Sequence, residues 1–341
     1  MIPKFMGKSI KREKMNKDIK RIGILTSGGD APGMNAAIRA VVRSAGFHDL
    51  HVYGVLEGYK GLIEGNIKRL DSTDVANTIH RGGTILKTAR CEEFKSKEGR
   101  QMAYDTLQAF DIDAMIVIGG NGTYTGAKYF STEFDIPFIG LPGTIDNDIW
   151  GTDFTIGFDT AINTAVEAID KIRDTADSHN RLFFVEVMGR HAGFIALNTG
   201  IGSGAAATFL PETSWGVEEL LTMLKKAAKR RKLFNIVVVA EGNKNGSAHQ
   251  LAEAVDKKLG KYDTRVTTIG HLQRGGSPSA ADRVLASTLG YEAVECLVKG
   301  HKNKALGIVN SNLFMCDFHD AITEKKELNH EMMNLLSILA M

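Results

Sequence analysis

At 341 residues, the chain is long enough for two domains or for one large α/β unit with a sizeable core. Its 43% hydrophobic and 24% charged residues are ordinary for a soluble globular protein, and its formal net charge of +2 gives no reason to expect a nucleic acid or a membrane as partner. No apolar run reaches the roughly 18 residues of a membrane span, which argues against a transmembrane protein.

The first twenty residues differ from the rest of the chain. Residues 1–20 are rich in Lys and Met and lack an apolar stretch of signal-peptide length, so we expect a flexible, solvated arm. The cysteines Cys91, Cys296 and Cys316 are widely spaced and form no CxxC motif. A disulfide framework or a zinc site is therefore not expected, and a reducing compartment is the default. Together these features predict a cytoplasmic location.

A strand, a glycine-rich turn and a helix come first in the folded part. Residues 22–26 are apolar, residues 27–33 read Ser-Gly-Gly-Asp-Ala-Pro-Gly, and a helix is expected from about Met34 to Ala45. Such a unit can cradle a phosphate, because the amides at a helix N-terminus are unpaired donors. Arg39 and Arg43 share one face of that helix, where they are either solvated or grip a phosphate.

A second unit of the same kind follows an intervening strand. Residues 51–56 predict that strand, and Arg90 follows a glycine-rich bend, where it is either a phosphate ligand or part of a surface salt bridge. Residues 114–118 are strongly apolar and lead into Gly-Gly-Asn-Gly-Thr at 119–123, with a helix from about Tyr124. The loop is not a Walker A motif, since no Gly-Lys-Ser/Thr follows, and it does not match GxGxxG.

Two carboxylates stand two residues apart after the next strand. The apolar run 136–141 predicts a buried strand that Pro142 and Gly143 break, so Asp146 and Asp148 should lie on a loop at its carboxyl end, where ligands of open α/β sheets bind. One carboxylate could take a proton from a substrate hydroxyl while the other holds a metal. The alternative is an Asx-rich turn.

The second half of the chain continues the alternation of strands and helices, which predicts a mostly parallel sheet with right-handed crossovers. Expected helices cover residues 160–176, 216–232, 247–259 and 281–299, and expected strands cover 182–187, 234–240 and 266–269. Polar side chains gather at strand ends, in a set that suits several phosphates, a metal and one general base. This set is Arg90, Asp146, Asp148, Arg181, Arg190, Glu241, Arg265, His271 and Arg274.

The motifs, taken together, resemble those of the bacterial-type 6-phosphofructokinases. The matching stretches are TSGGDAPGMN at 26–35, PGTIDND at 142–148, Met188-Gly189-Arg190 and GHLQRGG at 270–276. The resemblance covers about residues 20–320. It implies two Rossmann-like three-layer α/β domains, with mostly parallel sheets and an active-site cleft between them. The larger, nucleotide-binding domain would comprise residues 21–156 and 272–322, and the smaller, sugar-phosphate-binding domain residues 157–271 and 323–341.

The resemblance also implies transfer of the γ-phosphoryl group of ATP to the 1-hydroxyl of fructose 6-phosphate. Asp146 matches the residue that takes the hydroxyl proton, Thr144 matches a contact to the transferred group, and Arg190 and Arg90 match residues that stabilise the transition-state charge. The residues that match the sugar-phosphate pocket are Thr144, Ile145, Asp146, Arg181, Met188, Gly189, Arg190, Glu241, Arg265, His271, Leu272, Gln273 and Arg274. In the family, two of these arginines reach across from a neighbouring subunit, so a homotetramer with shared active sites is expected.

The phosphoryl donor is predicted from two glycines. Family members that use diphosphate carry Asp where Gly122 stands and Lys where Gly143 stands, so the two glycines favour ATP. The diphosphate-dependent reaction is the alternative. The residues that match the nucleotide site are Gly29, Tyr59, Arg90, Cys91, Gly120, Asn121, Gly122 and Thr123.

Asn121 and Cys91 depart from the family pattern. The family has an Asp where Asn121 stands, and that Asp orients Mg²⁺ through water. An amide keeps an acceptor oxygen but loses the negative charge, so Mg²⁺ affinity should fall, with Asp148 the remaining carboxylate near the ion. Cys91 replaces an aromatic residue of the nucleotide site. A weakly active regulatory paralogue is the alternative that Asn121 favours; a lipid or NAD kinase would explain this one loop and leave the other motifs idle.

An effector site is implied less completely. The basic residues that match it are Arg39, Arg43, Arg173, Arg230 and Lys232. Ser72, Asn77 and Ala206, however, stand where charged residues are common in the family, so ADP and phosphoenolpyruvate are expected to act weakly.

Overall fold

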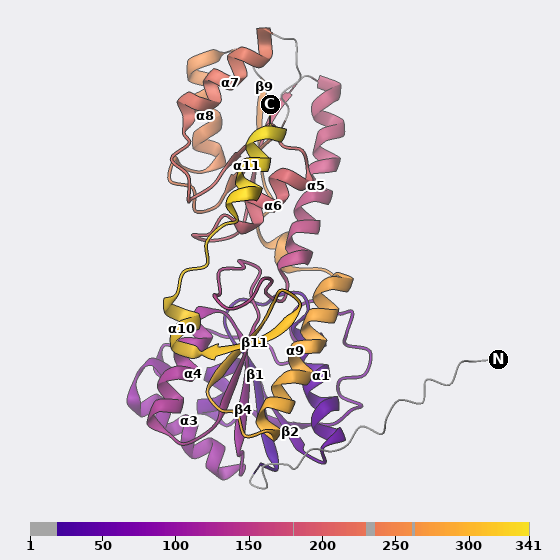
Figure 1. Ribbon diagram of the computed structural model, residues 1–341, viewed down its shortest axis with the longest axis vertical. Helices are drawn as coiled ribbons and strands as arrows, with labels where there is room; N and C mark the ends of the chain where they lie inside the picture. The colour runs from indigo at the N-terminus through magenta and orange to yellow at the C-terminus, as the bar shows by residue number, and fades with distance from the viewer. Residues whose placement is uncertain (1–18, 180, 230–235, 261–262, 341) are drawn as a thin grey trace, which may run out of the picture.

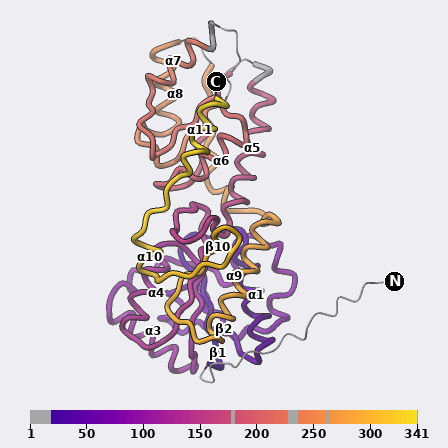
Figure 2. Tube along the Cα trace, in the orientation of Figure 1, coloured from indigo at the N-terminus to yellow at the C-terminus, as the bar shows by residue number. Residues whose placement is uncertain are grey.

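A computed structural model of the chain describes residues 19–179, 181–229, 236–260 and 263–340. These residues form two lobes, stacked one above the other in Figure 1, and the tube in Figure 2 follows the chain between them. The lower lobe carries a seven-stranded sheet and the upper lobe a four-stranded sheet. The predicted class, α/β with mostly parallel sheets, is confirmed.

The sheet of the lower lobe is parallel except at its two edges, where β3 and β11 run antiparallel to their neighbours. Its strands, in spatial order, are β11 (Asn312–Asp317), β10 (Lys304–Val309), β5 (Phe138–Pro142), β4 (Ala114–Gly119), β1 (Arg21–Thr26), β2 (His51–Val55) and β3 (Ile67–Leu70).

Successive side chains of these strands are buried on opposite faces of the sheet. Ile22 and Ile24 of β1 belong to one apolar cluster and Leu25 to another, and the same alternation holds along β4. A parallel sheet needs helices on both faces, which is why its strands read as near-continuous apolar runs. The helices of the described chain are α1 (Met34–Phe47), α2 (Gly58–Glu64), α3 (Lys97–Ala109), α4 (Asn121–Glu133), α5 (Phe158–His179), α6 (Phe194–Gly202), α7 (Val217–Lys229), α8 (Ala248–Leu259), α9 (Ala280–Val298), α10 (Phe318–Thr323) and α11 (His330–Leu339), with the 3₁₀ helices η1 (Glu93–Lys95) and η2 (Gly270–Arg274).

In the lower lobe, α1 and α9 pack against each other on one side of the sheet, and α3, α4 and α10 lie on the other (Figure 1). The strand order β3-β2-β1-β4-β5 means that the chain leaves β1 toward β2 and later returns to the other side of β1 as β4. The direction of winding therefore reverses between β1 and β4. Ligands of open α/β sheets bind beyond the carboxyl ends of the strands at such a reversal.

The upper lobe has an all-parallel sheet in the order β7-β8-β6-β9. Its strands are β6 (Arg181–Val187), β7 (Ala207–Phe209), β8 (Ile236–Ala240) and β9 (Asp263–Thr268). The helices α5, α6 and α11 lie in this lobe, and α7 and α8 lie at its far side (Figure 1). Buried residues of α5, α6 and β6 share one apolar cluster with β1, β4 and α1, so the two lobes have a continuous core.

Some boundaries differ from the sequence-based predictions. The strand expected at 136–141 is β5, which includes Pro142, so the proline occupies the last strand position instead of breaking the strand. The predicted arm, residues 1–20, lies outside the described residues except for Ile19 and Lys20. Ile19 is buried, and the Lys20 N–H donates to Asp113 Oδ2 at 2.7 Å, so these two residues belong to the folded lobe. Among the described residues, no helix combines the length and the apolar character that crossing a membrane requires.

Candidate active site

Two glycine-rich loops meet where the sheet reverses its winding. The first follows β1 and enters α1, and the second follows β4 and enters α4. The Ser27 N–H donates to Ile118 O at 3.0 Å, and Thr123 Oγ1 donates to Ser27 O at 3.1 Å. A Cβ on Gly119 would overlap both Ser27 O and the Thr123 side chain, so only glycine permits this approach. The first glycine loop and the N-terminus of α4 therefore share one concave corner, which suits phosphate groups.

An aromatic wall stands beside this corner. Tyr59 is buried, its hydroxyl donates to Thr123 O at 2.7 Å, and its ring stacks on Phe94 with centroids 4.0 Å apart. Burial raises the pKa of the Tyr59 hydroxyl, which keeps it neutral and able to donate. Cys91 is half-buried in the same wall and Arg90 next to it is exposed. This wall can hold the flat part of a nucleotide.

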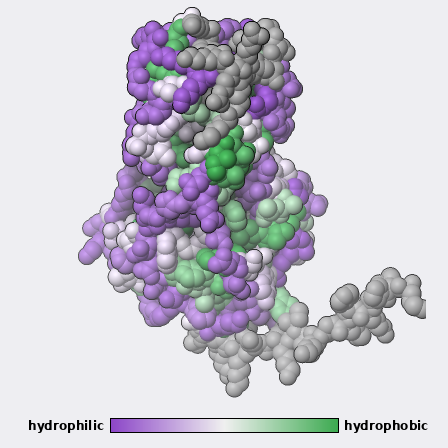
Figure 3. Space-filling model, turned by 45° about the horizontal axis from the view of Figure 1, so that its top comes forward, coloured by the Kyte–Doolittle hydropathy of each residue, from purple (hydrophilic) through white to green (hydrophobic). Residues whose placement is uncertain are grey.

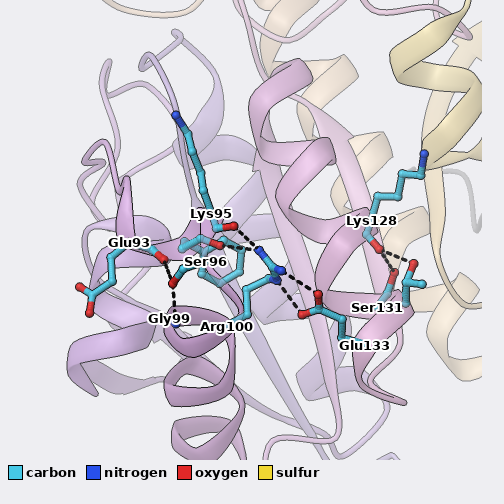
Figure 4. Close-up of polar contacts among 10 residues, drawn as sticks. Glu93, Lys95, Ser96, Gly99, Arg100, Lys128, Ser131 and Glu133 are labelled. Atoms are coloured by element: carbon cyan, nitrogen blue, oxygen red, sulfur yellow. Dashed lines mark hydrogen bonds and ion pairs between the residues drawn. The ribbon is translucent and has the colours of Figure 1, made fainter.

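Arg100 fixes the segment that carries the wall, as Figure 4 shows. Its guanidinium donates to Phe94 O at 3.1 Å and to Lys95 O at 2.7 Å. The same group makes a two-point contact with the Glu133 carboxylate, at 2.6 and 2.7 Å, and the pairing lowers the pKa of Glu133. Arg100 is 6% exposed, so this bidentate pair is largely shielded from water. The sequence-based prediction missed Arg100 and Phe94, since neither belongs to a glycine-rich motif.

The acidic turn follows β5 and lies beside the phosphate corner. Asp146 is 4% exposed, and its Oδ1 has no hydrogen-bond partner among the described residues. Burial is the main cause that raises the pKa of Asp146 to about 6; Asp148 adds to the rise, while Arg274 and Arg190 oppose it. A buried carboxylate with a free oxygen and a pKa near neutrality is suited to proton transfer.

The other carboxylate is paired with an amide. Asn121, the first residue of α4, donates through Nδ2 to Asp148 Oδ2 at 3.0 Å. Burial raises the pKa of Asp148, and the Asn121 amide opposes that rise. The pair therefore holds one negative charge where two carboxylates would hold two. The sequence had predicted the loss of charge but not this contact.

The opposite wall comes from the upper lobe. Met188, Gly189 and Arg190 follow β6, and Glu241 follows β8. The Arg190 N–H donates to Glu241 Oε2 at 3.2 Å, which links the two loops. Arg190, Glu241 and His271 are exposed and line the cleft.

Arg274 and Gln273 take unexpected positions in η2. Arg274 Nη1 donates to Asp30 O at 3.1 Å, so its guanidinium lies against the first glycine loop. Gln273 is fully buried: its Oε1 accepts from the Met188 N–H at 2.8 Å and its Nε2 donates to Ala161 O at 3.2 Å. Both ends of the Gln273 amide are thus engaged within the protein. The Gln273 side chain is therefore held within the protein and does not reach the cleft, where the sequence had predicted a substrate contact.

One cleft of about 1020 Å³ brings most of the predicted residues together. Its lining includes Gly29, Tyr59, Arg90, Cys91, Gly120, Asn121, Gly122, Thr123, Thr144, Asp146, Met188, Arg190, Glu241, His271 and Arg274. Arg181 and Arg265 do not line it. Arg181 begins β6, seven residues before Met188, and both arginines pair with Asp263 at the start of β9. Five further predicted residues lie outside the lining: Ile145, Asp148, Gly189, Leu272 and Gln273. Ile145 and Gln273 are fully buried and Leu272 is 70% exposed.

The predicted effector-site residues that the structure describes, Arg39, Arg43 and Arg173, do not line this cleft. Arg39 and Arg43 are on α1, half-buried and exposed respectively. Arg173 on α5 donates to the Ser203 carbonyl. Arg230 and Lys232 lie outside the described residues.

The cleft also fits a divalent cation held mainly by phosphates. In the part of the chain that the structure describes, no three His, Cys, Asp or Glu residues converge as a metal cage. Mg²⁺ in nucleotide sites commonly uses one or two carboxylates and completes its shell with water and phosphate oxygens. Asp146 lines the cleft with an unpartnered Oδ1. Asp148 does not line it but contacts Asn121, which does, so both carboxylates supply oxygen donors of that kind beside the phosphate corner.

The fold and the cleft define a two-lobed α/β protein that can bind a phosphorylated ligand beside a buried carboxylate. A family model described as phosphofructokinase matches residues 21–297. The chain belongs to the phosphofructokinase family, and the resemblance predicted from the motifs is confirmed.

Similar proteins are named more specifically. The "ATP-dependent 6-phosphofructokinase 2" of Bacteroides thetaiotaomicron is 54% identical over 322 residues, which cover 94% of this chain and 99% of the relative. The "ATP-dependent 6-phosphofructokinase" of Cytophaga hutchinsonii is 51% identical over 93% of this chain and 97% of the relative. Among solved structures, Pichia pastoris phosphofructokinase in the T-state matches with a TM-score of 0.84 and 35% identity, over 97% of this chain and 37% of the longer yeast chain.

Proposed function

We propose that this protein transfers the γ-phosphoryl group of ATP to the 1-hydroxyl of fructose 6-phosphate, giving fructose 1,6-bisphosphate and ADP. The observation that carries the proposal is the buried Asp146, which has an oxygen without a hydrogen-bond partner and lines the same cleft as the phosphate corner of the lower lobe and the Arg190 wall of the upper lobe. The names of the relatives agree with the ATP-dependent reaction predicted from the sequence.

The chain's own residues divide the chemistry between them. Asp146 accepts the proton of the attacking hydroxyl, and Thr144 contacts the transferred group. Arg190 and Arg90 stabilise charge on the equatorial oxygens, since phosphoryl transfer depends on positioning and electrostatics. Asp148, with Asn121, would hold Mg²⁺, which neutralises phosphate charge when bound. The raised pKa of Asp146 keeps it a competent base near neutral pH.

The lobes bind different substrates in this proposal. Residues 21–156 and 272–322 hold the nucleotide, and residues 157–271 with 323–341 hold the sugar phosphate. Glu241, His271 and Arg274 supply the sugar side from the same chain.

Arg181 and Arg265 instead act from a neighbouring subunit of a homotetramer. Arg181 begins β6 and Arg265 pairs with Phe183 near the same end of that strand, whereas their own cleft lies beyond its carboxyl end. Exposed apolar side chains such as Val284 and Ile338 suit subunit contacts. Figure 3 shows apolar areas on an otherwise hydrophilic face.

Regulation and location are further parts of the proposal. The basic residues Arg39, Arg43 and Arg173 could bind an anionic effector. Charged residues of the family that would hold ADP are replaced here by Ser72, Asn77 and Ala206, so effectors act weakly. A cytoplasmic location suits the three cysteines, which are all free thiols in the structure.

The preference for ATP over diphosphate rests on the space at two glycines. A Cβ on Gly122 would meet nothing within 4 Å, so the cleft is open there for the rest of a nucleotide. A Cβ on Gly143 would lie 2.8 Å from Ile118 Cγ2 and 3.2 Å from the Gly119 backbone nitrogen. The lysine of diphosphate-dependent relatives would therefore require the backbone at position 143 to shift.

Gly122→Asp tests the proposed donor. The new carboxylate would lie at the N-terminus of α4, where the helix dipole tolerates it, so folding should be retained. Repulsion from the nucleotide phosphates should raise the KM for ATP by about tenfold or more, the effect of roughly 1.4 kcal/mol of like-charge repulsion. Gly122→Ala is the control for bulk and should stay near wild type. A wild type that prefers diphosphate at equal concentration would contradict the proposal.

Asn121→Asp tests the proposed cation site. The substitution would replace the amide donor at 3.0 Å from Asp148 with a second carboxylate, and the added charge attracts Mg²⁺. We expect saturation at lower free Mg²⁺ and a modest rise in kcat, measured by titrating Mg²⁺ against rate for both proteins. Identical curves at full activity would show that position 121 does not influence the cation. A wild type that is inactive at every Mg²⁺ concentration and is revived by the substitution would favour a regulatory paralogue.

A further inference from the structure

Lys326 lies in residues 324–329, the segment that joins α10 of the lower lobe to α11 of the upper lobe (Figure 1). Its side chain is half-buried and turns back toward the lower lobe. The ammonium donates to Asn147 Oδ1 and to Asp153 O, each at 2.9 Å. Burial lowers the pKa of Lys326 to about 8, while the Asp153 and Asp148 carboxylates favour its charged form. Lys326 belongs to none of the family motifs in this chain.

Asn147, the partner of Lys326, forms the turn between the two acidic residues of the cleft. It is buried and adopts a left-handed backbone conformation with φ 55°, which sets the directions in which Asp146 and Asp148 leave the turn. Its Nδ2 donates to Asp153 O at 3.1 Å, and its Oδ1 accepts from the Thr155 N–H at 2.9 Å. The Asn147 side chain thus joins the turn to residues 153–155. Lys326 joins the same turn to the segment between α10 and α11.

The same ammonium also contacts the upper lobe. Lys326 Nζ lies 5.1 Å from the centroid of the Phe194 ring, within the range of a cation–π interaction. Phe194 is buried and begins α6, four residues after Arg190. One side chain therefore contacts the turn that carries Asp146 and the helix that follows the Arg190 loop.

We propose that Lys326 is a positioning residue that sets the Asp146 turn of one lobe against the Arg190 loop of the other. The inference rests on the proposed function, in which these two residues act on the same phosphoryl group. Proton transfer and charge stabilisation both depend on the separation of the two loops, and a displacement of about 1 Å can cost roughly a hundredfold in rate.

Lys326→Met is the direct test, in the full-length protein with ATP and fructose 6-phosphate. Methionine keeps the length of the side chain and loses the donors. Asn147 Oδ1 and Asp153 O each keep one other hydrogen bond, so neither acceptor is left unpaired in the variant. We expect kcat to fall by about ten- to a hundredfold, with both KM values within about threefold of wild type, because positioning acts on the transition state and not on ground-state binding. Lys326→Arg should recover part of the loss.

Lys325→Met is the matched control. Lys325 is the neighbour of Lys326 and is exposed, so this variant should behave as wild type. Phe194→Leu provides a second variant: it should lower kcat by about threefold or more through loss of the cation–π contact, and it should add little to Lys326→Met.

A kcat for Lys326→Met within about twofold of the Lys325→Met value would overturn the inference, as would a raised KM at unchanged kcat. If Lys326→Met does not fold, Phe194→Leu at full kcat would overturn it. Inactive wild type and Lys325→Met proteins would instead count against the proposed function.

Discussion

Asp146→Asn is expected to lower kcat by about 10²–10⁴-fold, the contribution that general-base catalysis typically makes. Asparagine has nearly the same shape but cannot accept the hydroxyl proton. The KM for fructose 6-phosphate should change little, because Glu241, His271 and Arg274 remain in place. Steady-state kinetics of the two proteins provides the measurement, and near-normal turnover would remove Asp146 from the role of base.

Stability supplies an independent control for this variant. Burial raises the pKa of Asp146 above the value of an exposed aspartate, so keeping this carboxylate ionised at neutral pH costs the folded protein stability. Replacing it with a neutral amide should therefore leave Tm unchanged or raise it. A loss of activity with an intact Tm is then a chemical effect.

The pH dependence of kcat follows from the same carboxylate. A base must be deprotonated to act, so the rate should fall by about tenfold per pH unit as pH drops below the Asp146 pKa of about 6. Asp146→Asn should lack this acid limb.

Arg190→Met is expected to reduce kcat by about 10³-fold, at the lower end of what an arginine contributes to phosphoryl transfer. The contact between the Arg190 N–H and Glu241 is made by the backbone and should survive, so the wall keeps its shape. Arg190 also opposes the rise of the Asp146 pKa. Its removal should therefore move the acid limb of the residual activity to higher pH.

Arg190→Lys is the matched control for charge. Lysine keeps the positive charge but not the planar donors of arginine. In Arg190→Lys, the acid limb should therefore return close to its wild-type pH, while kcat should stay well below wild type. An Arg190→Met protein with full kcat and an unshifted limb would contradict the proposed role.

The local features of this fold could be predicted from the sequence. The glycine loops after β1 and β4, and the acidic turn after β5, are set by short-range chemistry: apolar runs form the strands, and glycines allow the close approach at Gly119. Parallel strands bring their carboxyl ends to one edge of a sheet, which is why residues from distant motifs line one cleft.

Contacts between distant segments could not be predicted in this way. Gln273 looks like a substrate ligand within its motif, but it is buried against Met188, 85 residues away. From the sequence, Asn121 is an uncharged acceptor where the family has an Asp, whereas in the fold its amide nitrogen donates to Asp148. Lys326 has no sequence pattern at all, because its role depends on Asn147, 179 residues earlier. Such roles arise only when segments distant in the sequence are packed together.

The proposed phosphoryl transfer is most directly tested by identifying the product that purified wild-type protein and Asp146→Asn form from ATP, Mg²⁺ and fructose 6-phosphate. Phosphorus NMR distinguishes a new phosphate ester at the 1-hydroxyl from free phosphate. We expect wild type to form fructose 1,6-bisphosphate and ADP in equal amounts, and Asp146→Asn to form almost none in the same time. Equal production by both proteins, or release of free phosphate without a new ester, would contradict the account.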